Sequence, residues 1–317
     1  MRTCLIFCLI VIFNVKLVAQ VSFIEKLNQS EKLFLDSGVS LTFDEPTQID
    51  PAKPTKIILF ALPNGNTTAQ SYGKKLARGD DWHFDIQHIG AQTSFIRNTD
   101  KQTNYIVIYL ENTLKSWPAW RSKFKDDGRI NKMVDYIYQK YAIYNPKLSL
   151  TCHSGGGSFI FGYLNSLPQI PSYVDCIGFL DATYGYESEK HKEKLITWLK
   201  TKNKSLQVIS YNDSVVVYNG KPLVSPTGGT WFRSQLMVKD LQTQFKLKKI
   251  DLVDRFNWSN RTNLIDFTLI KNPEAKIYHT VLVEKNGFIQ LIFNGTNFSQ
   301  KSYKFWEERA YTDFILN

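Results

Sequence analysis

Short apolar segments that alternate with helical patterns limit what this chain can fold into more than any other feature. The apolar segments are Lys56–Leu62, Tyr105–Leu110, Lys147–Cys152, Val174–Leu180 and Leu206–Tyr211. Helical stretches lie between most of them, such as residues 130–141, where apolar residues recur every three or four positions. Strands that alternate with helices form a mainly parallel sheet, and strands buried on both faces are apolar throughout. The sequence therefore predicts an α/β fold with a mainly parallel, doubly covered sheet.

The same alternation indicates the extent of the domain and one interruption in it. Residues 20–317 contain no internal repeat or low-complexity segment and are expected to form one domain. Further strands are expected at Val39–Phe43 and, as the last strand, at Leu264–Ile270. Residues 214–262 break the rhythm with a Pro-Thr-Gly-Gly turn and a helical stretch. This segment forms either a cap over the sheet edge or an irregular surface excursion.

The first residues have the features of an export signal. Arg2 precedes an unbroken apolar run, Leu5–Phe13, and Leu17–Ala19 offers a cleavage site with a small last residue. The apolar run is short for a membrane span, so an uncleaved anchor is the less favoured alternative. The sequence thus predicts that residues 1–19 are removed and that the mature protein is secreted or periplasmic, with no membrane span.

Charge and cysteine content argue against several kinds of site. The net charge is +10, and it falls by two with the loss of Arg2 and Lys16. The lysines are scattered, which indicates a solvated surface and no nucleic-acid patch. Cys152 and Cys176 lie in predicted strands, where free buried thiols are favoured over a disulfide. No Cys or His cluster has zinc spacing and no phosphate-binding glycine motif occurs, so we expect neither metal nor cofactor.

One strand ends in a serine between small residues. The stretch Leu148–Gly157 reads L-S-L-T-C-H-S-G-G-G, and a helical pattern follows at once. A serine that projects its hydroxyl from a strand end needs a tight, strained turn, in which bulky neighbours of Ser154 would clash. Gly155 and Gly156 satisfy that need, while Cys152 stands where a glycine is usual. The alternative is an ordinary glycine-rich strand-to-helix turn.

Over residues 38–317 the chain resembles the α/β-hydrolase superfamily, in element order and most specifically in the C-H-S-G-G stretch. In that family a serine, an acid and a histidine follow one another along the chain. The resemblance implies Ser154 as nucleophile and His279, which follows the last strand, as base. His191 lies in a charged helical stretch that is expected to be solvated. His153, beside the serine, is expected to point away from the nucleophile.

Two aspartates are candidates for the acid. Asp213 follows the strand Leu206–Tyr211, the position that the resemblance favours. Asp181 ends the preceding strand, where some hydrolases of the family place their acid. We favour Asp213 and keep Asp181 as the alternative, since an aspartate at a strand end is often only a turn former or helix cap.

The resemblance also implies an oxyanion hole. Its donors are expected to be the amide of Gly155 and an amide from the Pro-Asn-Gly-Asn loop, either Asn64 or Gly65. That loop is also an ordinary turn sequence. Four tryptophans are expected near the same sheet edge, either as a platform for a sugar or aryl group or as core residues. They are Trp82, Trp117, Trp120 and Trp231.

The function implied is that of a secreted serine hydrolase. The expected substrate is a carbohydrate or aryl ester, either a small molecule or an acyl group linked to a polysaccharide. Peptidases and acyltransferases use the same three residues, and a catalytically inert binding module on the same fold is the alternative from another class.

Overall fold

A computed structural model describes residues 22–317; the predicted export signal at residues 1–19 lies outside them. A ten-stranded sheet forms the centre of this part of the chain, in the order β1-β2-β4-β3-β5-β6-β7-β12-β11-β10. The strands are β1 (Glu31–Leu35), β2 (Val39–Asp44), β3 (Thr55–Ala61), β4 (Asn104–Asn112), β5 (Lys147–His153), β6 (Val174–Leu180), β7 (Ser205–Tyr211), β10 (Lys248–Asp251), β11 (Arg255–Ser259) and β12 (Ile265–Ile270).

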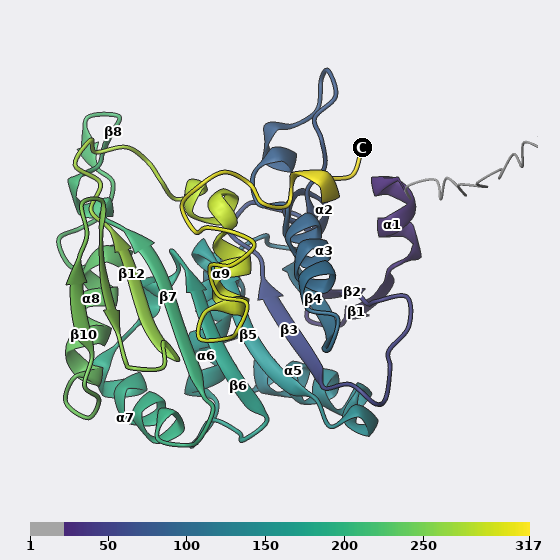
Figure 1. The fold of residues 1–317 in the computed structure, drawn as a ribbon, viewed down its shortest axis with the longest axis horizontal. Coiled ribbons are helices and arrows are strands. Elements are labelled where there is room, and N and C mark those ends of the chain that lie inside the picture. The colour runs from purple at the N-terminus through teal and green to yellow at the C-terminus, as the bar shows by residue number, and fades with distance from the viewer. Residues whose placement is uncertain (1–21) are drawn as a thin grey trace, which may run out of the picture.

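Helices cover both faces of this sheet (Figure 1). They are α1 (Phe23–Gln29), α2 (Thr68–Tyr72), α3 (Ile89–Thr99), α4 (Trp117–Phe124), α5 (Gly128–Lys140), α6 (Gly157–Asn165), α7 (Ser188–Leu199), α8 (Thr230–Leu241) and α9 (Phe288–Phe293). One core layer contains buried residues of α4 to α8, and the other contains buried residues of α2, α3 and α9. The predicted α/β fold with a doubly covered sheet is therefore confirmed.

The strand β3 shows why the central strands are apolar at every position. Ile57 and Leu59 pack into the layer of α4 to α8, whereas Ile58 and Phe60 pack into the layer of α3 and α9. Successive side chains of a strand point to opposite faces, so a strand covered on both faces needs apolar residues at each. The strands β4, β3, β5, β6, β7 and β12 pair in parallel, so their carboxyl ends meet at one edge of the sheet.

Residues 214–262 contain a hairpin, a helix and two strands that extend the main sheet. A small hairpin of β8 (Val217–Tyr218) and β9 (Lys221–Pro222) comes first, and α8 follows it. The strands β10 and β11 then add to the sheet in antiparallel pairing beside β12. Of the two interpretations offered by the sequence, a cap and an irregular excursion, neither describes β10 and β11, which belong to the main sheet.

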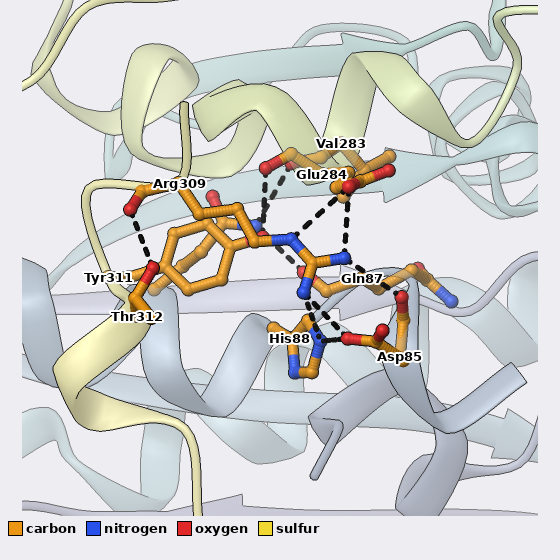
Figure 2. Close-up of polar contacts among 9 residues, drawn as sticks. Asp85, Gln87, His88, Val283, Glu284, Arg309, Tyr311 and Thr312 are labelled. Carbon is orange, nitrogen blue, oxygen red and sulfur yellow. Dashed lines mark hydrogen bonds and ion pairs between the residues drawn. The ribbon is translucent and has the colours of Figure 1, made fainter. Parts of the chain in front are cut away.

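The C-terminal segment is fastened to the fold by an arginine between two carboxylates (Figure 2). Arg309 Nη1 donates to Asp85 Oδ1 at 2.6 Å, and its Nη2 donates to Glu284 Oε1 at 2.9 Å. His88 Nε2 contacts the same Asp85 oxygen at 2.6 Å, and the His88 side chain is fully buried. This cluster joins three distant parts of the chain, one of which begins just after His279.

Replacement of Arg309 with Ala should lower the free energy of unfolding by about 2 kcal/mol, because Asp85 and Glu284 would lose a charged hydrogen-bond donor. Urea denaturation of the purified protein measures this. Arg261→Ala, at an exposed turn before β12, is the matched control and should change stability little. Equal losses in the two variants would contradict a stabilising role for the cluster.

Candidate active site

Ser154 lies in a strained turn between β5 and α6. Its φ of +54° falls in the left-handed region, which is uncommon for residues other than glycine. A short 3-10 turn over Ser154–Gly156 leads directly into α6. Ser154 is half-buried, at the carboxyl edge of the sheet. The strand, strained turn and helix that the sequence predicts at this serine are all present.

The glycines after Ser154 are needed for close packing. A Cβ on Gly157 would overlap the backbone carbonyl of Ala182, and a Cβ on Gly156 would overlap that of Ala61. Backbone atoms cannot move aside as the end of a flexible side chain can, so these positions exclude any larger residue. The turn that carries Ser154 is thereby held against the ends of both neighbouring strands, β3 and β6.

His279 is paired with Asp181. The Nδ1 atom of His279 lies 2.5 Å from Oδ2 of Asp181, whose side chain is fully buried, while the His279 side chain is one quarter exposed. A carboxylate only accepts hydrogen bonds, so Nδ1 is the donor in this pair, and in the neutral form of the ring Nε2 is then an acceptor. This tautomer is the one that a general base needs.

The backbone of His279 is fixed beside the serine turn. His153, the residue before Ser154, donates from Nε2 to the carbonyl oxygen of His279 at 3.0 Å, and the two rings are 4.6 Å apart. Burial and the neighbouring His279 hold the pKa of His153 well below its usual value, so the ring stays neutral. His153 therefore serves as a donor that joins the two candidate residues, a role that the sequence did not indicate.

A closed loop carries the chain from β12 to His279. Asn272 Nδ2 donates to the carbonyl oxygens of Asn212 and Lys276, at 2.9 and 2.8 Å, and Asn272 Oδ1 accepts from the Lys276 amide. After His279 the chain does not form one continuous helix, because Lys285 and Asn286 have non-helical backbone angles and a regular α-helix begins only with α9. The position of His279 after the last strand is nevertheless as expected.

Asp213 does not contact His279, contrary to our preferred assignment. Its carboxylate instead accepts from the backbone N–H groups of Thr230 at 2.7 Å and Trp231 at 3.3 Å, and so caps α8. The alternative aspartate, Asp181, makes the contact expected of the acid. The reason is geometric: α8 begins opposite the end of β7, and its free amides bind the carboxylate that lies nearest to them.

Of the three expected oxyanion donors, one is already engaged. The amide of Gly65 donates to the carbonyl oxygen of Lys115 at 2.8 Å and is not free to bind a substrate. Gly155 is the second residue of the 3-10 turn, where amides have no partner within the helix. The Asn64 side chain packs directly on Gly155, so the expected loop does adjoin the serine turn.

The structure also shows the burial of the remaining histidine, tryptophan and cysteine residues considered in the sequence. His191 is fully buried in contact with Asn165, so the prediction of a solvated residue is wrong. Trp117 and Trp120 are core residues, whereas Trp82 is exposed and Trp231 half-buried. Cys152 and Cys176 are free and buried, as predicted.

The part of the chain that the structure describes, residues 22–317, offers neither a clustered metal site nor a membrane-spanning helix. Within that range, no group of three or more His, Cys, Asp or Glu side chains is arranged to hold a metal ion. None of the helices there has the length and apolar content needed to cross a bilayer.

A cavity of about 680 Å³ lies at the amino ends of β5 and β7, lined in part by Lys147 and Lys204. It is at the edge of the sheet opposite Ser154 and is not part of the candidate site.

Comparison with known proteins shows similarity at the level of fold. No protein-family profile and no curated protein sequence matches the chain. A thermostable esterase is 11% identical with a TM-score of 0.51, over 85% of this chain and 64% of that one. Two other solved structures have lower TM-scores. The siderophore hydrolase EstB from Aspergillus nidulans is 13% identical with a TM-score of 0.42, over 84% of this chain and 94% of that one. The acetyl xylan esterase from Aspergillus awamori is 8% identical with a TM-score of 0.44, over 77% of this chain and 92% of that one. The chain thus spans about two thirds of the esterase and has the α/β-hydrolase fold.

The pKa of the Asp213 carboxyl predicts how the stability of the protein depends on pH. Burial and, next, the charge of Asp181 raise the pKa of Asp213 to about 6 from an ordinary value of 3.8. A raised pKa means that the folded state disfavours the charged form, so this residue's contribution to stability is full below pH 4 and is lost as the pH rises through 6. Asp213→Asn should therefore gain stability relative to the wild type between pH 4.5 and 7.5. Urea denaturation at both pH values measures that difference, and a constant difference would contradict it.

Proposed function

We propose that this protein is a serine hydrolase that cleaves a carboxylic ester, with Ser154 as nucleophile, His279 as general base and Asp181 as the acid of the triad. The observation that carries the proposal is the 2.5 Å contact between His279 Nδ1 and Asp181 Oδ2. It prepares the ring for base catalysis beside a serine whose φ of +54° is typical of a nucleophile at a strand end.

The proposed reaction is an acyl transfer through Ser154. His279 Nε2 takes the proton of Ser154 Oγ as that oxygen attacks the ester carbonyl carbon, and Asp181 stabilises the resulting imidazolium. Collapse of the tetrahedral intermediate breaks the bond to the alcohol, which leaves with the proton from His279. A water molecule, deprotonated by His279, then hydrolyses the acyl-enzyme and releases the acid and Ser154.

The negative oxygen of the intermediate needs donors that are aimed at it in advance. The amide of Gly155 is one such donor in this proposal, and the amide of Asn64 is the second, because the amide of Gly65 is bound to Lys115. The Asn64 side chain against Gly155 supports this choice, since it holds the loop beside the serine turn.

The proposed substrate is an ester whose acyl or aryl group meets an open, partly apolar surface. Tyr184 follows Asp181 closely in the chain, and burial and, next, the negative charge of Asp181 raise the pKa of the Tyr184 hydroxyl. Ile277 precedes His279 by two residues, and both Tyr184 and Ile277 are substantially exposed. Such a surface suits a small aryl ester or an ester on a polysaccharide. The predicted export signal supports action outside the cytoplasm.

Replacement of Ser154 with Ala should abolish labelling by a fluorophosphonate probe and hydrolysis of p-nitrophenyl acetate. Stability should stay within ~1 kcal/mol, because a half-buried hydroxyl is removed without loss of core volume. Ser166→Ala, at the other end of α6, is the control and should label normally. Labelling that persists in Ser154→Ala would overturn the assignment. A wild-type protein that does not label would favour a binding module.

Replacement of Asp181 with Asn should reduce turnover on the order of ten-thousand-fold, because an amide at this position supports the wrong tautomer of His279. Steady-state hydrolysis of p-nitrophenyl acetate measures this. Asp266→Asn is the matched control: Asp266 is also a buried carboxylate, but it lies near the amino end of β12. Comparable losses in the two variants would mean that folding, and not the triad, accounts for the effect.

A further inference from the structure

Two buried carboxylates lie side by side at the candidate active site. Asp181 and Asp213 follow the ends of the adjacent strands β6 and β7, and both are almost completely buried. The hydroxyl of Thr230 touches both: it hydrogen-bonds to Asp181 Oδ1, and it lies 3.3 Å from Asp213 Oδ2. Thr230 is the first residue of α8. A continuous line of polar contacts therefore runs from Asp213 through Thr230 and Asp181 to His279.

A helix cap alone does not account for Asp213. The N-cap residue of α8 is Gly229, and Asp213 reaches the free amides of the helix from a segment 17 residues earlier in the chain. The titratable groups that face Asp213 are Asp181 and the phenols of Tyr184 and Tyr211, none of which is a cation. Within residues 22–317 no salt bridge includes Asp213, and its charged form is disfavoured in the fold. Asp213 therefore forms no ion pair within these residues, and it affects the site through the hydrogen bonds of its carboxylate.

The contacts of Thr230 indicate that use. The two backbone amides that bind Asp213 belong to the first turn of α8, so Asp213 fixes the position of the Thr230 side chain. A Cβ on Gly229 would overlap the Asp213 carboxylate, so this approach of helix and carboxylate is tight. A hydroxyl has one hydrogen to donate. The closer contact of Thr230 Oγ1 is the one with Asp181 Oδ1.

We propose that Asp213 is a positioning residue that acts through Thr230: it holds the Thr230 hydroxyl on Asp181 Oδ1, which leaves Asp181 Oδ2 aimed at His279 Nδ1. This inference rests on the proposed function, because it assigns Asp181 and His279 to the triad. In this arrangement Asp213 and Thr230 support Asp181 at the carboxylate oxygen that does not contact His279. A carboxylate held at only one oxygen can rotate, and a small misplacement of a triad member lowers the rate strongly.

The test compares Thr230→Val with Thr230→Ser. Valine has nearly the same shape and keeps the backbone N–H that binds Asp213, but it removes the hydroxyl; serine keeps the hydroxyl. With p-nitrophenyl acetate, Thr230→Val should lower kcat about 10- to 100-fold with little change in KM. Thr230→Ser should stay within about threefold of the wild type. Equal activity of Thr230→Val and the wild type would overturn the proposal.

A double-mutant cycle tests the order of the contacts. If Asp213 acts through Thr230, Asp213→Asn should lower kcat in the wild-type background but not further in Thr230→Val. Independent, additive losses would contradict the proposal and leave Asp213 as a structural cap. Thermal unfolding of each variant, followed by circular dichroism, separates a loss of folding from a loss of positioning.

An NMR measurement on the His279 ring tests the positioning of Asp181 without relying on catalytic activity. The proton on His279 Nδ1 should give a low-field NMR resonance, identified by its absence in His279→Gln. That resonance should move in Thr230→Val and Asp213→Asn but remain in place in Thr230→Ser. An unmoved resonance in all three variants would overturn the inference. A wild-type protein that fails to react with the fluorophosphonate would instead overturn the proposed function, whatever the resonance does.

Discussion

The parallel pairing of β5, β6, β7 and β12 is the constraint on which the candidate active site depends. Because these strands run in the same direction, the residues that follow them meet at one edge of the sheet. Ser154 follows β5, Asp181 follows β6, Asp213 follows β7, and His279 comes after a closed loop beyond β12. The strand pairing thus brings residues separated by up to 125 positions along the chain to one edge of the sheet.

Local strain and close packing then set the position of each group. Ser154 and Asp181 both have positive φ, +54° and +44°, and both come directly at the end of a buried strand. Such backbone is held in place only where the surroundings allow no other arrangement. Gly156 and Gly157 provide those surroundings at Ser154, because they pack against the carbonyls of neighbouring segments without room for a Cβ. The amide of Asp181 donates to the carbonyl of Ile209 on β7 at 2.7 Å, which fastens the second strained position to the sheet.

Polar contacts around His279 extend in two directions. On one side the carbonyl of His279 accepts from His153, and this contact ties His279 to the turn that carries Ser154. On the other side Arg309 holds Glu284, and with it the segment after His279, to Asp85. The histidine lies on a loop, yet it is fixed at its carbonyl, at its ring and through the chain that follows it. The role proposed for His279 needs such support, because proton transfer is efficient only within hydrogen-bond distance.

The sequence by itself determined the parallel, doubly covered sheet, the serine turn and the histidine after the last strand. Each of these is local: apolar runs, small residues around Ser154 and the order of elements are visible without knowledge of long-range contacts. Which aspartate reaches His279 was decided only by the tertiary structure. Asp181 and Asp213 both end buried strands, and nothing near either in sequence shows that α8, which begins at Thr230, binds Asp213. The burial of His191 and the donor role of His153 were likewise invisible, because each depends on a partner more than twenty residues away, Asn165 in one case and His279 in the other.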